Sequence, residues 1–166
     1  MYQLKRLEHR NLAAAIEMAE HYRALNEPEE AESICRDVLE VDSNHQVALR
    51  ILGLALTDEF LKTRTKNFEE ARTVFSRLTS EYERMYYTGI AWERAGKAHL
   101  ELGEHHNALS CLEHALEQYE EAERIGSKDL PDPVLRWNRC VRVLKEHPEL
   151  VRASATSHTK TPLLGD

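Results

Sequence analysis

The sequence lacks an excess of positive charge, and this absence bears directly on nucleic-acid binding. Its formal net charge is −7 at pH 7. Neutralising the phosphates of a nucleic acid requires a clustered surplus of lysine and arginine. The one basic cluster, Lys62, Arg64 and Lys66, lies in a polar stretch, where such charges are usually just solvated. We therefore expect no nucleic-acid partner.

Long apolar runs and paired cysteines are also missing. No apolar segment approaches the length of a signal-peptide core or a membrane span. The three cysteines, Cys35, Cys111 and Cys140, are far apart and never spaced as C-x-x-C, so neither a disulfide framework nor a redox motif is present. A reducing compartment is the simplest inference. We expect a cytoplasmic protein with no membrane partner.

The motifs of common enzymes are absent as well. There is no G-x-S-x-G, no glycine-rich phosphate loop and no H-E-x-x-H. The glutamates between 117 and 123 run along a helix face, as they do on a solvated surface. We expect neither catalysis nor a cofactor.

Scarce glycine, proline and aromatic residues favour helices over a sandwich or a barrel. Helical periodicity extends over nearly the whole chain, and we expect the first helix to include Leu4 and Leu7 in its apolar stripe. Gly103 and Gly126 stand where left-handed caps would end two further helices. From 152 to 166 the packing pattern is lost, which predicts a disordered tail.

The predicted helices pair, and the pairs repeat an arrangement of small and large residues. A small residue allows two helices to cross closely, and a larger one three or four positions later fills the gap beside the crossing. Stacked hairpins of this kind form a solenoid. The small positions are Ala19, Gly53 and Gly96 in the first helices, and Ala31, Ala71 and Ala108 in the second helices.

This arrangement resembles the tetratricopeptide repeat, a helix-turn-helix unit of about 34 residues. The resemblance implies an all-α, right-handed α-solenoid of about three repeats and a C-terminal capping helix, together occupying residues 1–147. The second repeat holds about six extra residues, and we expect the 57–67 segment to form a longer helix or turn. The repeats would cover about 12–45, 46–84 and 89–126, and the capping helix about 133–146. The third repeat matches best, through Trp92, Gly96, Gly103, Ala108, Leu112 and Ala115.

The same resemblance implies a non-enzymatic scaffold or adaptor that binds a peptide or helix of a partner protein in a concave groove. The first helix of each repeat would line this groove. Some relatives hold acidic peptide ends with a basic clamp, but here only Arg94 matches that clamp, so an amphipathic segment is the better expectation. The expected groove residues are Ile16, Glu20, Arg23, Arg50, Leu54, Thr57, Ile90, Glu93, Lys97 and Leu100.

Three alternatives stay open at this point. The apolar groove residues could simply seal contacts between helices. An incompletely capped end could let the solenoid associate with itself as a homo-oligomer. His99, Cys111 and His114 could contribute to a metal site, although structural zinc usually needs four ligands. A partly buried, hydrogen-bonded core histidine is the plainer expectation for His99.

Overall fold

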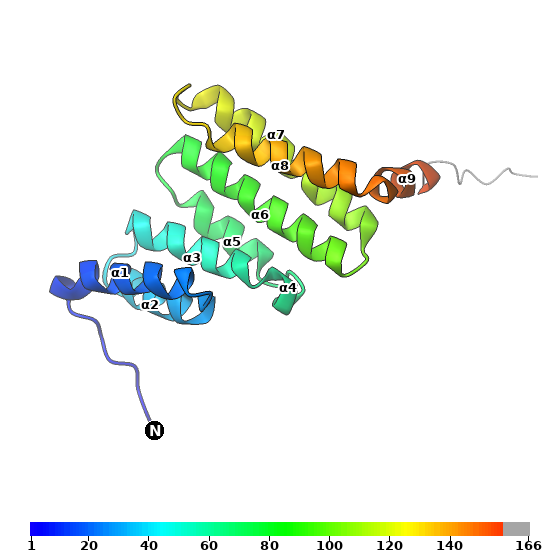
Figure 1. Cartoon of the computed structure of the whole chain (residues 1–166). Coiled ribbons are helices and arrows are strands. Elements are labelled where there is room, and N and C mark those ends of the chain that lie inside the picture. The colour runs from blue at the N-terminus through cyan, green and yellow to red at the C-terminus, as the bar shows by residue number, and fades with distance from the viewer. Residues whose placement is uncertain (158–166) are drawn as a thin grey trace, which may run out of the picture.

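The computed structural model describes residues 1–157, and these form a stack of helices with no strand among them (Figure 1). The expectation of an all-α fold is therefore confirmed. In chain order the elements are a 3-10 turn η1 (His9–Asn11), α1 (Leu12–Ala24), α2 (Pro28–Val41), α3 (Gln46–Asp58), α4 (Phe60–Thr63), α5 (Phe68–Ser76), α6 (Glu81–Glu101), α7 (His105–Ile125), α8 (Asp132–Glu146) and α9 (Pro148–Ser157).

Local sequence signals explain where several helices begin and end. Pro28 occupies the first turn of α2, where its missing N–H costs nothing. Gly103 follows α6 with a φ of 74°, the left-handed conformation expected of it. Gly126 differs from the prediction, since it ends α7 in an extended conformation. A Cβ at this position would lie 2.8 Å from the ring of Tyr82, so close packing explains the glycine.

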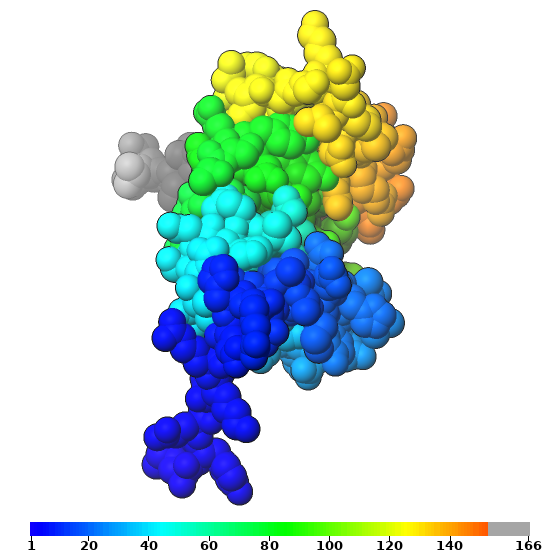
Figure 2. Space-filling model, turned by 90° about the vertical axis from the view of Figure 1, so that its left-hand side faces the viewer, coloured from blue at the N-terminus to red at the C-terminus, as the bar shows by residue number. Residues whose placement is uncertain are grey.

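The helices stack as successive hairpins, α1 with α2, α3 with α5, and α6 with α7. Figure 2 shows these units following one another along the molecule from the N-terminal to the C-terminal end. The small residues lie at the crossings as expected. At Gly53 any side chain would collide with the ring of Phe75, and at Gly96 a Cβ would lie 2.9 Å from Cγ of Leu112. These contacts hold each first helix against its second helix.

The extra residues of the second unit form a separate short helix and a tight turn. Glu59 separates α3 from α4. In α4, Phe60 is buried while Leu61 is 46% exposed. Arg64 and Thr65 follow with φ of 51° and 60°, in the left-handed region. The side chain of Asn67 donates to the carbonyl oxygen of Leu56 at 3.0 Å and ties this turn back to α3.

Both ends differ from the sequence expectation. Residues 1–8 form no helix and project from the body of the molecule (Figure 2), and Leu4 is 95% exposed instead of packed. At the other end, α9 continues to Ser157, so the prediction of disorder is wrong for residues 152–157. Residues 158–166 of that predicted tail lie outside the described part.

The helix α8 covers the third unit. Cys140 and Val143 on α8 are buried together with Leu109 and Leu112 of α7, and Leu150 of α9 joins the same cluster. Within residues 1–157, the stack of hairpins therefore ends with α8 and α9 packed together on α7.

Candidate functional site

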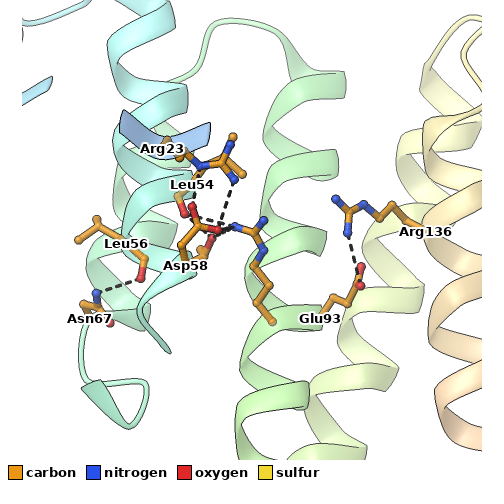
Figure 3. A network of polar contacts seen from close by, with 9 residues as sticks. Arg23, Leu54, Leu56, Asp58, Asn67, Glu93 and Arg136 are labelled. Atoms are coloured by element: carbon orange, nitrogen blue, oxygen red, sulfur yellow. Dashed lines mark hydrogen bonds and ion pairs between the residues drawn. The ribbon is translucent and has the colours of Figure 1, made fainter. Parts of the chain in front are cut away.

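A network of charged side chains connects the first helices of neighbouring units (Figure 3). Asp58, at the end of α3, is its centre. Its carboxylate accepts a hydrogen bond from Nε of Arg23 on α1 at 2.6 Å and pairs with Nη1 of Arg94 on α6, also at 2.6 Å. Arg94 donates further to the Thr57 hydroxyl at 2.5 Å and to the Leu54 carbonyl oxygen at 3.2 Å. One carboxylate thus joins three units.

Burial is the largest influence on the pKa of Arg94. Loss of water around the guanidinium lowers its pKa, and the negative charge of Asp58 partly offsets that effect. Because arginine stays protonated far above neutral pH, the group remains a cation. Arg94 is the residue that matches the basic clamp of some relatives, but here Asp58 neutralises it.

A second cluster surrounds Glu93 on α6. The Glu93 side chain is completely buried. It accepts a hydrogen bond from the hydroxyl of Tyr119 on α7 at 2.7 Å and from Nζ of Lys97 one turn away. Arg136 of α8 approaches the same carboxylate with Nη1 at 3.5 Å (Figure 3). This carboxylate therefore holds the capping helix to the third unit.

The pKa values in this cluster follow from burial and charge together. Burial alone would raise the pKa of Glu93, but the hydrogen bonds from Lys97 and Tyr119 and the charges of Lys97 and Arg136 outweigh it, and the pKa falls below 4.5. Burial and the neighbouring Glu93 carboxylate raise the pKa of Tyr119. Glu93 is therefore ionised and Tyr119 protonated at neutral pH.

Three cavities lie in a row along the edge of the molecule where each hairpin turns. The first cavity, about 460 Å³, lies between the start of α2 and the end of α3. The second, about 190 Å³, lies between α3, α4 and the last turn of α6. The third, about 440 Å³, lies between the α6–α7 turn, α8 and α9.

These cavities share lining residues and so adjoin one another, and together they are called the trough below. Asp58 lines both the first and the second cavity. Lys97 and Glu101 line both the second and the third. The trough runs past the α1–α2 turn, α4, the α6–α7 turn and the α8–α9 junction, which Figure 1 shows as successive turns of the chain. It therefore crosses every unit of the solenoid.

The ten expected groove residues divide into two groups. Thr57, Lys97 and Leu100 line the trough. The other seven lie on the first helices outside the trough, and several of them are buried or paired with other residues of the chain. Ile90 and Glu93 are buried, so that neither can touch a partner, and Arg50 pairs with Glu83 of α6 at 2.9 Å.

The alternative that apolar groove residues seal helix contacts therefore holds for two of them. Ile16 belongs to the core of the first two units, and Ile90 belongs to that of the third unit and the cap. Glu20 is exposed, and Arg23 is held by Asp58. Leu54 is half-buried between both cores. None of these five lines the trough.

Sequence reasoning missed several trough and network residues. Asp58, Glu59 and Glu101 lie at the ends of helices, where helical periodicity does not predict which way a side chain points. Arg136 lies on the arginine-rich polar face of α8, and its Nη1 approaches the Glu93 carboxylate at 3.5 Å. The signal that could have found Asp58, Glu59 and Glu101 is their place next to a turn, whereas Arg136 lies inside α8 and has no such signal.

The histidine and cysteine candidates are in ordinary packing roles. His99 bonds through Nδ1 to Glu104 at 2.5 Å, as expected of a partly buried histidine. His114 bonds to the Ser110 carbonyl oxygen and packs against Trp92 with the ring planes tilted and the ring centroids 4.6 Å apart. Within residues 1–157, no group of three or more histidine, cysteine, aspartate or glutamate side chains is arranged to hold a metal ion. The geometry gives the His99, Cys111 and His114 alternative no support.

The three cysteines are buried, unpaired thiols. Burial raises the pKa of Cys35 to about 12 and that of Cys111 to about 11. The pKa of Cys140 rises to about 12 for the same reason, and nearby Glu93 adds to the effect. All three therefore remain protonated at neutral pH, in the form that is a poor nucleophile.

The fold is that of a helical-repeat protein of the α-solenoid class. Within residues 1–157, no helix is long and apolar enough to cross a membrane. Comparison with known families identifies the repeat: residues 90–123, in α6 and α7, match the family described as tetratricopeptide repeat. Residues 90–123 are thus a tetratricopeptide repeat, which confirms for the third repeat the resemblance seen in the sequence. No protein of curated function matches it.

Proposed function

We propose that this chain is a non-enzymatic protein-interaction module that binds an extended peptide segment of a partner along the trough. Tetratricopeptide repeats typically mediate contacts between proteins, which supports the general class. The observation that carries the location is the sharing of Asp58, Lys97 and Glu101 between adjacent cavities. An extended peptide of about 12 residues reaches roughly 40 Å and can follow such a row of adjoining cavities.

The trough suits an amphipathic segment, as expected from the sequence. In its second cavity Leu61 is the exposed apolar side chain, with the buried Phe60 and Ala98 beneath it. In its third cavity the partly exposed Leu100 lies over the buried Val143, with Arg139 and Glu149 at the rim for polar groups. Alternate side chains of an extended peptide would therefore find both kinds of contact.

Glu101 provides the sharpest test because it lies at the junction of two cavities and its side chain is exposed. Peptides of about 12 residues are first selected from a random displayed library with the intact chain. Glu101→Arg should weaken their binding at least about tenfold, which corresponds to ~1.4 kcal/mol. Titration calorimetry measures the affinity, and amide shifts in nuclear magnetic resonance spectra locate the peptide.

The control is Glu113→Arg, which makes the same charge change on an exposed position of α7 away from the trough. It should leave the affinity unchanged. Selected peptides that bind both variants equally, or that shift only amides outside 26–30, 57–62, 94–105 and 139–149, would show that the trough is not the docking site.

Self-association is a second candidate, and the outer side of α8 favours it. Leu135 is 61% exposed there, Val134 is also exposed, and Leu130 is exposed in the segment before the helix. Apolar side chains at an open solenoid end are suited to contact a second copy. Light scattering that returns a monomer mass at every concentration up to about 1 mM, on the order of the weakest specific affinities, would remove this candidate.

A further inference from the structure

The first cavity of the trough is lined by many more carboxylates than cations. Its charged residues are Glu27, Glu29, Glu30, Asp58, Glu59 and Lys62. Asp58 is already paired with Arg23 and Arg94, and Lys62 contacts Glu29. The remaining carboxylates, Glu27, Glu30 and Glu59, accept no side-chain hydrogen bond from the rest of the described chain. The cavity therefore keeps an unbalanced negative charge.

Glu59 is the most unusual of these groups. Its side chain is only 9% exposed, yet the nearest cation, Nζ of Lys62, stands 3.8 Å away, beyond hydrogen-bonding distance. Burial, together with the charges of Glu32 and Asp58, raises the pKa of the Glu59 carboxyl. Lys62 is therefore a distant ion-pair partner for the Glu59 carboxylate, which lines an open cavity of about 460 Å³.

We propose that the first cavity binds the arginine or lysine side chain of the partner peptide, with Glu59 and Glu30 as its main contacts. This inference rests on the proposed peptide-binding function of the trough. A cationic head group in the cavity would bring Glu59 a donor closer than Lys62, and a guanidinium, with five N–H donors in a plane, can reach two carboxylates at once.

The rest of the trough explains why this charge sets orientation. In the second cavity, Asp58 and Glu101 balance Arg94 and Lys97. The third cavity has three carboxylates against Lys97 and Arg139, so the largest excess of negative charge is at the first cavity. A peptide with one basic residue near one end would therefore lie in a single direction along the trough. Charge at this site would select both the partner and its polarity.

The experiment compares pools of random peptides about 12 residues long that carry arginine, alanine or glutamate at one fixed position near either end. The intact chain should retain the arginine pool at least about tenfold better than the alanine pool, and the glutamate pool least. This preference should diminish as salt rises, because part of it is screened electrostatics. Glu59→Gln and Glu30→Gln should each remove most of it, whereas Glu113→Gln should not.

Two further readouts keep the result interpretable. Because folding disfavours the charged form of Glu59, Glu59→Gln should bind the arginine pool less well yet unfold at a slightly higher temperature. Glu30 is exposed, so its variant tests the charge with little risk to folding. Equal retention of the arginine and alanine pools, with Glu101→Arg still blocking both, would overturn this inference alone. Failure of every pool to bind would overturn the trough as well.

Discussion

At the residue scale, Glu93 holds α6, α7 and α8 together through a single carboxylate. It receives hydrogen bonds from Tyr119 and Lys97 and the charge of Arg136. A fully buried carboxylate is stable in the protein only because these partners replace its water. Its function is therefore structural, although it lies on the first helix of the repeat that the family match covers.

Replacing this carboxylate should cost stability in a way that depends on pH. Glu93→Gln keeps the shape of the side chain but loses the ion pairs, and we expect it to lower the free energy of unfolding by about 2–4 kcal/mol at pH 7. Since folding lowers the pKa of Glu93 below 4.5, this contribution is complete above pH 4.5 and declines as the pH falls through the folded-state pKa. The gap between variant and wild type should therefore narrow in acid.

Urea unfolding followed by circular dichroism at a series of pH values between about 3 and 7 measures this gap. Glu113→Gln, on an exposed part of α7, is the matched control and should track the wild type throughout. A gap that stays constant down to pH 3 would mean that Glu93 is not an ion-pair partner in the folded protein.

Glu93 also shows what could and what could not be predicted from the sequence. The small residues Gly53 and Gly96 were placed correctly, because their partners lie within one helical hairpin and follow from periodicity. Glu93 was assigned to a groove because its nearest partner outside its own helix, Tyr119, is 26 positions away and Arg136 is 43 positions away. Periodicity tells which face of a helix turns inward, but it does not tell which distant charge neutralises a polar residue on that face.

At the scale of elements, the short helix α4 and its turn distinguish the second unit from a regular repeat. The number of extra residues was evident from the sequence, but their conformation was not. Thr65 adopts a φ of 60°, which is unfavourable for a β-branched residue. The turn is held by the hydrogen bond from the Thr65 amide to the Phe60 carbonyl oxygen at 2.8 Å and by the bond from Asn67 to Leu56.

Thr65→Asn should therefore stabilise the protein. Asparagine tolerates the left-handed conformation better than threonine, and the expected gain is about 0.5–1 kcal/mol. The thermal midpoint should rise by about 1–4 °C for a chain of this size. Calorimetry measures the change, and Thr73→Asn, in the regular helix α5, is the control that should not stabilise. A lower midpoint for Thr65→Asn would show that the turn is not strained at this position.

At the scale of the whole molecule, α8 and α9 complete a stack in which each unit contacts mainly its neighbours. Their buried residues, Cys140, Val143 and Leu150, cover α7 and belong to a different core cluster from the buried residues of α1 and α2. In such an array stability is approximately a sum of unit and interface contributions. Loss of the cap should therefore weaken the third unit first.

A chain that ends after residue 126 tests this expectation against one that ends after residue 157. Losing the burial of three apolar side chains and the Arg136 contact should cost several kcal/mol, at roughly 1.5–3 kcal/mol per buried apolar side chain. Hydrogen exchange should then accelerate in α6 and α7 and change least in α1 and α2, because these helices keep their own interface. Equal acceleration in all helices would instead make the solenoid one cooperative unit, and it would mean that a partner bound at the first cavity is coupled energetically to the cap.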